Sequence, residues 1–506
     1  MKRFALYLLF ILLASGHALA LEAGASKTDI TAPVGTPLNG YGARMGRDST
    51  SVHDPIWSRA LYLDDGTTRL FLVSVDLVAV NPELRARVLE LAPDIVPTEN
   101  IILTATHTHS GQGAMIRTIP MRFVSGRFIP EVLESTAEGI VESMRNAYDK
   151  RRRAALGYAV GAQEGLSVNR RYPDGPTDPQ IGVILVEDAD GNPISVVTNF
   201  TAHPTSVSGE DLFAFSADYP GFYYLEMEEL VGPQCVPIFL NGAQGNQTIG
   251  NPEGKSGWAR TESVGRLVAR RAHKIASNIA FGDVTLRLSH SQARLPHTLA
   301  DFLLPESVWL HSLEINDLLL SFFPGETCVE IGLEMRRRAL ARGYEAHFSV
   351  GLSNDYLMYF VPRHLYPDLS YESSANMYGP GIEDWFYEQF ESLMSRNRPD
   401  DEPAPDGAMD VAAASPPEPR TIAGGVLLEL EGGPREIGLA RGNLFIADIQ
   451  QRFNTRVVAP VDAGAWRPDS GMLRMMPPFL DVAALALPLL GTRARPLLKE
   501  LGMDLL

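Results

Sequence analysis

Disulfide frameworks, membrane spans and basic clusters are features that this sequence lacks. It contains only two cysteines, Cys235 and Cys328, so a framework of several disulfides is excluded, although these two could pair in an exported protein. No apolar run reaches the ~20 residues that cross a membrane. Lysine and arginine occur in runs of at most four residues, and the net charge is −17. These features argue against binding to nucleic acid or an anionic membrane surface and favour a small or neutral partner.

The first twenty residues carry the pattern of an export signal. Lys2 and Arg3 precede a short apolar run, and Ala18-Leu19-Ala20 supplies the small residues that signal peptidase requires. We therefore expect residues 1–20 to be a cleavable signal peptide. The mature protein should be secreted or periplasmic.

From residue 60 onward, apolar β-branched segments alternate with segments of helical spacing. Strands are predicted over 60–63, 70–75, 101–106, 181–186, 194–200, 235–240, 318–323 and 348–352, and helices over 82–91, 131–148 and 382–394. Residues 23–42 are rich in glycine, proline and threonine and are predicted to be irregular loop. The alternation predicts a layered α/β domain over residues 21–397.

Composition changes near residue 398. Residues 398–424 are rich in proline, aspartate and alanine without apolar periodicity, which predicts a linker. Residues 425–506 show a helical pattern but are few for a complete domain, so we expect a partial, mainly helical module there.

Polar residues follow several of the predicted strands. His107 and His109 end the strand over 101–106, and because residues two apart in an extended chain point the same way, they should project together. His203 follows the strand over 194–200, and Glu326 and Tyr359 follow two later strands. In α/β sheets, ligands bind outside the carboxyl ends of strands, where these groups would gather.

Two or three histidines with a glutamate form the usual ligand set of a hydrolytic zinc site. Each residue also has a simpler interpretation. The paired histidines could be hydrogen-bonded loop residues, His203 a turn cap, and Glu326 a surface charge. Asp76, which ends another strand, is interpreted as a strand-end cap. The recurrence of one layout along the chain favours the zinc site.

A series of short motifs resembles a known family in order and spacing. The motifs are His107-Thr108-His109-Ser110-Gly111, Asn169-Arg170, Ala202-His203-Pro204, Ser216-Ala217-Asp218-Tyr219-Pro220-Gly221, Pro324-Gly325-Glu326, residues 351–359, Tyr371-Glu372 and Tyr378-Gly379-Pro380. Over residues 21–397 the chain resembles the neutral (alkaline, non-lysosomal) ceramidases. The resemblance implies hydrolysis of the amide bond of N-acyl sphingosines. It also implies zinc ligands at His107, His203, Glu326 and Tyr359, with supporting or substrate-contacting roles for His109, Arg170 and Tyr371.

One loop departs from the family pattern. The family carries Gly-Asp-Val-Ser-Pro-Asn with a catalytic serine, whereas residues 242–247 here are Gly-Ala-Gln-Gly-Asn-Gln. Gly245 stands in place of that serine and has no side chain to attack an amide, so a serine nucleophile is excluded at this position. Ser110 and Thr248 lie nearby in sequence without the spacing of a triad.

We therefore expect a metal-activated water to cleave the amide. His109 is the candidate proton shuttle to the leaving amine. Gln244, Asn246 or the backbone N–H groups of residues 241–245 could line an oxyanion site, and Arg170 and Tyr371 would place the substrate.

The expected protein is an exported zinc-dependent amidohydrolase whose partner is an N-acyl sphingosine-like lipid, with at most transient contact to a membrane surface. Two alternatives stay open: a zinc hydrolase of another amide or an ester, and a silent lipid-binding relative. Apolar residues after the histidines, such as Met115, Ile116, Ile119, Met121 and Phe123, could line an acyl-chain groove or pack in the core. The sequence leaves oligomeric state and further cations open.

The tail carries a second resemblance. Residues 427–438 with Arg441-Gly442 resemble the opening of the linear-amide hydrolases related to penicillin acyltransferase and phospholipase B-like proteins. Their catalytic cysteine has no counterpart here, because no cysteine follows Cys328. We expect the tail to have no activity of its own, and a helical cap with a fortuitous glycine pattern is an equal alternative.

Overall fold

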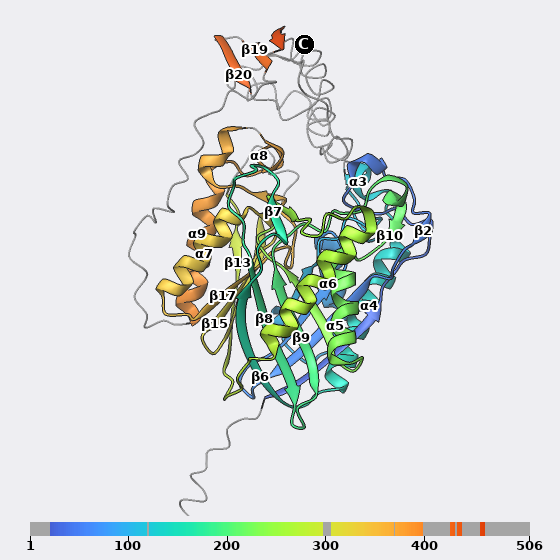
Figure 1. Cartoon of the computed structure of the whole chain (residues 1–506), viewed down its shortest axis with the longest axis vertical. Coiled ribbons are helices and arrows are strands. Elements are labelled where there is room, and N and C mark those ends of the chain that lie inside the picture. Colours follow the sequence, from blue (N-terminus) through green and yellow to red (C-terminus); the bar gives the residue numbers. More distant parts are fainter. Residues whose placement is uncertain are drawn as a thin grey trace, which may run out of the picture.

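Two large sheets with helices on their outer sides form the main layers of the described part of the chain (Figure 1). The structure, a computed structural model, describes residues 21–118, 121–296, 305–368 and 370–397, with three short strands at 426–430, 433–437 and 456–460. The predicted signal peptide and the predicted linker lie outside the described residues. The mixture of sheets and covering helices confirms the predicted α/β class.

The larger sheet has eight strands in the order β11-β9-β8-β6-β1-β3-β4-β5. These strands are β1 (Glu22–Asp29), β3 (Trp57–Asp64), β4 (Arg69–Val75), β5 (Ile101–Ala105), β6 (Arg152–Ala162), β8 (Gln180–Asp188), β9 (Pro193–Phe200) and β11 (Val236–Asn241). The pairs β4–β5 and β9–β11 are parallel. The sheet folds back on itself, because the Ser74 hydroxyl of β4 donates to the Phe239 carbonyl of β11 at 2.7 Å. The loops after β5 and β9 therefore open at one place.

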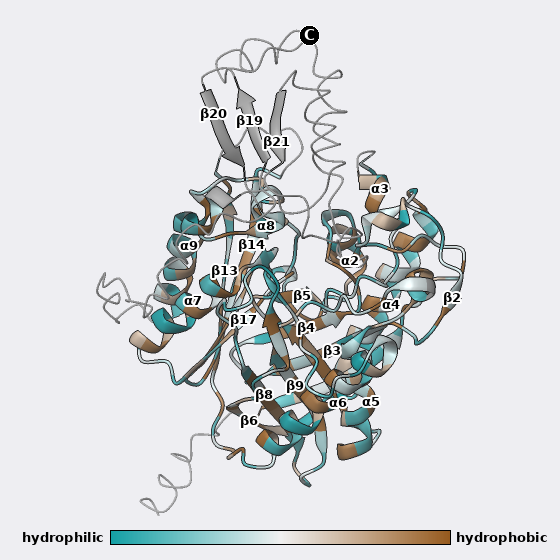
Figure 2. Ribbon diagram, turned by 45° about the horizontal axis from the view of Figure 1, so that its top comes forward, coloured by the Kyte–Doolittle hydropathy of each residue, from teal (hydrophilic) through white to brown (hydrophobic). Residues whose placement is uncertain are grey.

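The smaller sheet has the order β13-β14-β15-β17, and apolar side chains of both sheets pack together between them. Its strands are β13 (Leu286–Arg294), β14 (Ser307–Ile315), β15 (Leu318–Phe322) and β17 (Ala346–Val350). Helices α7 (Val329–Ala341) and α9 (Ile382–Asn397) cover its outer face. On the larger sheet, α2 (Pro82–Leu91) and α4 (Pro130–Asp149) cover β3 to β5, and α5 (Tyr219–Val231) and α6 (Gly257–Ala276) cover β8, β9 and β11. Figure 2 shows the apolar residues concentrated along the strands.

Short elements connect these layers. They are η1 (Gly42–Arg44), β2 (Ser51–Val52), η2 (Thr98–Asn100), α3 (Arg122–Ser125), β7 (Ser167–Asn169), η4 (Gly209–Phe213), β10 (Ala214–Phe215), β12 (Gln247–Ile249), β16 (Glu326–Thr327), β18 (Tyr359–Phe360), η5 (Arg363–Asp368) and α8 (Tyr371–Ser374). The small parallel pair β16–β18 sets Glu326 directly opposite Tyr359.

Local sequence explains several boundaries. Helix α2 begins where the Asn81 side chain accepts a hydrogen bond from the Leu84 N–H at 2.9 Å and Pro82 occupies the first turn. Strand β5 is buried along its whole length, as its continuous apolar sequence requires. Asp76, after β4, accepts from the Trp57 N–H at 2.9 Å, as expected of a strand-end residue.

The loop predicted over residues 23–42 is wrong over its first part, because β1 lies in the middle of the larger sheet. This strand is poor in β-branched residues because α4 packs directly on it. A Cβ on Gly24 would lie 2.2 Å from the Ala147 carbonyl oxygen of α4. The small residues thus serve close packing between a helix and a strand.

Both cysteines are buried and free, so the disulfide that the sequence allowed is not formed. In the tail, the described strands β19 (Val426–Leu430), β20 (Gly433–Ile437) and β21 (Arg456–Pro460) form one sheet. The mainly helical prediction for residues 425–506 is wrong for these strands, and the other residues of that segment lie outside the described part. Within the described residues, no helix combines the length and apolar character needed to cross a membrane.

Candidate metal centre

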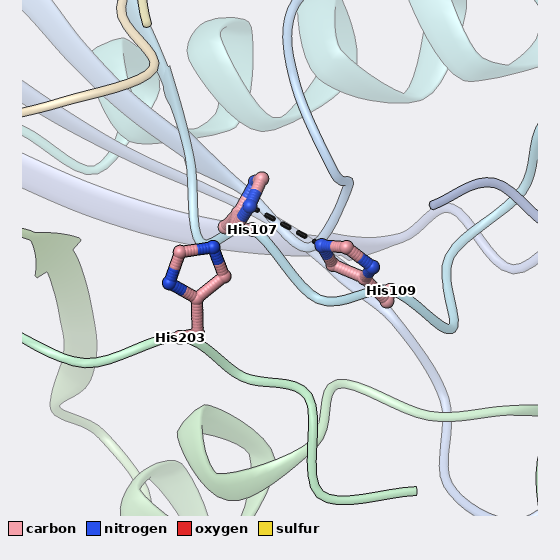
Figure 3. Close-up of side chains that lie close together, drawn as sticks. All are labelled: His107, His109 and His203. Carbon is pink, nitrogen blue, oxygen red and sulfur yellow. Dashed lines mark hydrogen bonds between the residues drawn. The ribbon is translucent and has the colours of Figure 1, made fainter. Parts of the chain in front are cut away.

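The loops after β5 and β9 bring three histidines together (Figure 3). The ligand atoms of His107, His109 and His203 all lie within 4.8 Å of one another, and the Nε2 atoms of His107 and His109 are 3.2 Å apart. The pair does not arise from an extended chain as predicted. Strand β5 ends at Ala105, and His107 has a left-handed backbone with φ 74°. A turn, not strand alternation, therefore brings the two rings together.

Glu326 closes the group from the other sheet. Its Oε2 lies 2.8 Å from His203 Nε2 and 3.1 Å from His107 Nε2. The Tyr359 Oη lies 3.3 Å from His203 Nε2. The four residues predicted as zinc ligands thus converge on one point, and none of their side chains is exposed to more than a few per cent.

Backbone carbonyls hold both buried imidazoles in one tautomer. His107 Nδ1 lies 2.6 Å from the Val78 carbonyl oxygen, and His203 Nδ1 lies 2.7 Å from the Gln244 and 2.9 Å from the Gln247 carbonyl oxygens. A carbonyl can only accept, so each Nδ1 carries the proton. Each Nε2 therefore turns its lone pair toward Glu326, which is the form that binds a metal.

Burial and charge set the protonation of the group. Burial, assisted by the Arg170 guanidinium, lowers the pKa of His203 to about 4. Burial and the neighbouring His107 hold the pKa of His109 well below its usual value. Burial opposes ionisation of Glu326, and its pKa is held well below the usual value only when a proton or a cation lies between its carboxylate and the two imidazoles. Neutral imidazoles beside a carboxylate are donors that fit a zinc ion.

Arg170 and Tyr371 support Tyr359. Arg170 Nη2 donates to the Tyr359 Oη at 2.9 Å and to the Gly245 carbonyl oxygen at 2.8 Å, and its Nε donates to Glu372 at 3.0 Å. The Tyr371 ring centroid lies 5.4 Å from that of Tyr359. These contacts fix the position of the phenol, and Glu372 is a partner that the sequence did not assign.

His109 lies beside the other members of the group with one nitrogen unused. Its Nδ1 is buried and has no hydrogen-bond partner among the described residues. The Tyr41 ring packs on it at 5.0 Å, and the Arg44 guanidinium donates to its carbonyl oxygen. The imidazole is thus held by its backbone and by ring packing, while Nδ1 keeps the capacity to exchange a proton.

Gln244 contributes through its backbone. Its carbonyl oxygen lies 2.7 Å from His203 Nδ1, whereas its buried side-chain amide finds no hydrogen-bond partner in the described part of the chain. The side chain points toward Gly351, where a Cβ would lie 3.0 Å from its Oε1. The structure thus gives no contact that joins the Gln244 amide to the histidines and Glu326.

Gly245 is packed against the strand that carries Glu326. A Cβ at this position would lie 2.7 Å from the Glu326 carbonyl oxygen and 2.8 Å from the Thr327 carbonyl carbon. The Gly245 N–H donates to the Thr327 carbonyl oxygen at 2.8 Å. Backbone atoms therefore fill the space that a serine side chain would need.

Asn241 is a supporting residue whose side chain the sequence did not single out. Its buried Nδ2 donates to the carbonyl oxygens of Thr106 and Ala202, each at 3.0 Å. These residues directly precede His107 and His203. One amide therefore ties together the two loops that carry the histidines, and its only signal in the sequence was a polar residue ending an apolar strand.

The apolar residues that follow the paired histidines, which could line an acyl-chain groove or pack in the core, differ in their burial. Met115 is buried in the core between β3 to β5 and the helices that cover them. Ile116, Met121 and Phe123 are partly exposed, and Ile119 lies outside the described residues.

Fold and site together define a layered α/β protein with a candidate metal centre of histidine and carboxylate at the ends of its strands. Residues 21–238 match the family described as neutral/alkaline non-lysosomal ceramidase, N-terminal. The chain is therefore similar to the neutral/alkaline ceramidases over its N-terminal part.

Two bacterial relatives illustrate the match. The neutral ceramidase of Mycobacterium tuberculosis is 27% identical over 234 residues, and that of Pseudomonas aeruginosa is 28% identical over 246 residues. These alignments cover 42% and 44% of this chain, and in each case 36% of the relative. The aligned part is therefore about a third of the length of each relative.

Solved structures share the fold over a longer stretch. The crystal structure of the Pseudomonas aeruginosa neutral ceramidase matches with a TM-score of 0.66 at 22% identity and covers 75% of this chain and 74% of that chain. A structure described as ceramidase complexed with C2 matches with a TM-score of 0.66 at 20% identity, covering 77% of each chain. The common fold thus extends well beyond residue 238.

Proposed function

We propose that this chain is a zinc-dependent amidase that cleaves the N-acyl amide of ceramide-like lipids. The observation that carries the proposal is that His107 Nε2 and His203 Nε2 lie 3.1 and 2.8 Å from the same carboxylate oxygen, Glu326 Oε2. Both of these histidines have their Nδ1 atoms occupied by carbonyls. The relatives that share its N-terminal part are named neutral ceramidases, which supports the substrate class.

A zinc ion held by His107, His203, Glu326 and Tyr359 would polarise the amide carbonyl and lower the pKa of a water molecule toward ~7. The protein positions these groups. Arg170 donates to the Tyr359 Oη and so fixes where the phenol oxygen lies.

Amide cleavage also needs a proton on the leaving amine. His109 is the group to take this proton from the attacking water and pass it to the amine, because it is neutral, lies beside His107, and has an unused buried Nδ1. Tyr371 packs on Tyr359 and would flank the substrate. The Gln244 side chain has no observed role, so backbone N–H groups of residues 241–245 are the better candidates for an oxyanion site.

Gly245 makes the reaction a direct hydrolysis. No acyl group can be carried on a side chain at this position, so amine and fatty acid should appear at the same rate. A burst of amine ahead of fatty acid would contradict this step. The same difference from the family supports a second candidate, a zinc hydrolase of other N-acyl compounds or of esters. A silent lipid-binding relative is the third.

The deciding experiment uses purified protein of residues 21–506 with its metal content measured. Fatty-acid release is followed from N-acyl sphingosines, N-acyl amino acids and simple esters, with and without a chelator. The variant His203→Ala should lose both zinc and turnover. His347→Ala is the matched control, because His347 is equally buried but bonds to the Ser321 hydroxyl of the smaller sheet.

Chelator-sensitive release from N-acyl sphingosine would support the first candidate, and release only from the other substrates would support the second. Absence of both zinc and release would favour the silent relative. We also propose export through the signal-like residues 1–20, which N-terminal sequencing of the mature protein would test.

A further inference from the structure

The loop between β17 and β18 brings two tyrosines to the metal centre. Tyr359 Oη lies 3.3 Å from His203 Nε2, and the Tyr356 hydroxyl donates to Glu326 Oε1. This leaves Glu326 Oε2 facing the histidines. The Met358 carbonyl oxygen also accepts from the Glu326 N–H at 2.8 Å. The conformation of this loop therefore decides how Glu326 and Tyr359 are presented.

The loop has an unfavourable backbone. Leu352, Asn354 and Met358 have φ values of 57°, 62° and 64°, in the left-handed region that residues with a Cβ rarely adopt. Asparagine tolerates this region best of the three. Such a backbone persists only where its surroundings hold it, so the contacts of the loop must supply the restraint.

Asn354 supplies that restraint by binding the open edge of β5. Its N–H donates to the Leu103 carbonyl oxygen at 2.7 Å, and its Oδ1 accepts from the Leu103 N–H at 2.9 Å. The Leu352 carbonyl oxygen accepts from the Ala105 N–H at 3.2 Å. Strand β5 is the last strand of its sheet, so the loop takes the place of a further strand. The register between them therefore fixes the loop that leads to Tyr359 against the strand that leads to His107.

His311 on β14 fixes the Asn354 side chain from behind. Its Nδ1 lies 2.9 Å from Asn354 Nδ2, and its Nε2 lies 2.8 Å from the Glu99 carbonyl oxygen. Asn354 Oδ1 is taken by the Leu103 N–H, so the amide must turn its NH₂ toward His311. His311 is fully buried, and burial lowers its pKa to about 3. The neutral ring thus accepts from Asn354 and donates to Glu99.

We propose that Asn354 and His311 are positioning residues of the metal centre, which lock the loop of residues 351–358 in register with β5. Neither residue touches the ligand atoms. The inference rests on the proposed function only in requiring that zinc binds. The two residues would act on metal affinity and loop order, not on the choice of substrate.

The test compares the zinc dissociation constant of the full chain with those of His311→Leu and Asn354→Gly, by competition with a chromophoric chelator. Glycine tolerates the left-handed backbone, so Asn354→Gly removes the side-chain contacts without adding strain. Each variant should weaken zinc binding by about tenfold or more, as loss of a group that orients metal ligands typically does. His311→Gln should recover most of the affinity, because its amide can both accept and donate.

Amide hydrogen exchange of the metal-free proteins gives a second readout. Exchange within residues 351–359 should be faster in His311→Leu and in Asn354→Gly than in the unsubstituted chain. The double variant should lose no more zinc affinity than the worse single variant, because both act through one contact.

His347→Leu is the matched control, since His347 is a buried histidine of the same sheet that bonds to Ser321 at 3.1 Å. It should lower stability while leaving zinc affinity unchanged. Wild-type zinc affinity in folded His311→Leu and Asn354→Gly, or equal weakening in His347→Leu, would overturn the proposal. If His311→Leu does not fold, the zinc affinities of Asn354→Gly and His311→Gln decide whether the proposal holds. Absence of zinc binding in the unsubstituted chain would refute the proposed function instead. Amide hydrogen exchange within residues 351–359 would then still show whether Asn354 and His311 hold the loop in register with β5.

Discussion

Replacing Gly245 with serine should damage the metal centre, although serine is what the ceramidase family carries in this loop. The added Cβ would lie 2.7 to 2.9 Å from backbone atoms of Glu326, Thr327 and Cys328. Backbone atoms cannot rotate out of the way as a side chain can. Either the loop or β16 must therefore move, and β16 carries Glu326.

The loss of stability in Gly245→Ser can be estimated from the packing around the added Cβ. Inserting a group into a filled space typically costs about 1–3 kcal/mol, so the free energy of unfolding should fall by that amount. Since ~1.4 kcal/mol corresponds to a factor of ten in an equilibrium constant, strain of this size at Glu326 would weaken zinc binding by about 5- to 150-fold.

Urea unfolding and chelator competition measure the two effects. Gly245→Ala should behave like Gly245→Ser, because the Cβ alone makes the contact. Gly282→Ala is the matched control, since a Cβ there has nothing within 4 Å and its backbone is not left-handed. Full stability and full zinc content in Gly245→Ser, or higher amidase activity than in Gly245→Ala, would refute the reasoning.

Four further predictions follow from the same contacts. Asn241→Asp keeps the shape but loses both N–H donors, so zinc content after dialysis should fall sharply at unchanged secondary structure by circular dichroism. Arg170→Lys cannot reproduce the fork of donors to phenol, carbonyl and carboxylate, and its turnover should drop about 10- to 100-fold in a fatty-acid release assay. Burial lowers the pKa of His311 to about 3. Neutral His311 therefore stabilises the fold fully at pH values above its ordinary pKa of about 6.5, and progressively less as the pH falls toward 3. Between pH 7 and 5 this loss is about 2 kcal/mol, so urea unfolding of His311→Gln should be less pH-dependent than that of the unsubstituted chain. Cys235 and Cys328 are free and buried, so a thiol reagent should label neither in the folded protein and both after denaturation.

The sequence predicted the elements with strong periodicity. The helix over 82–91 and the strands around 101–106 and 194–200 are found close to their predicted bounds, because continuous apolar runs leave few alternatives. Strand β1 was missed because small residues that serve helix packing resemble a loop.

At the site, the strand ends predicted which residues would gather. The sequence could not show why they stay in place. The support of His203 comes from the backbone carbonyls of Gln244 and Gln247, and a carbonyl leaves no mark in a sequence. The Asn241 amide looked like one more polar loop residue. The left-handed turn at His107 gives the paired imidazoles their arrangement, and no sequence rule for extended chains predicts it.

The folded-back sheet would also govern when a metal ion can be acquired. His203 and Glu326 are 123 residues apart in the chain, and Leu103 and Asn354 are 251 residues apart. No short segment of the nascent polypeptide contains a complete binding site. Long-range pairings of this kind form late and slowly, so a zinc ion would bind only after both sheets have closed. Metal content then reports completed folding, and bound zinc would stabilise the native state by mass action.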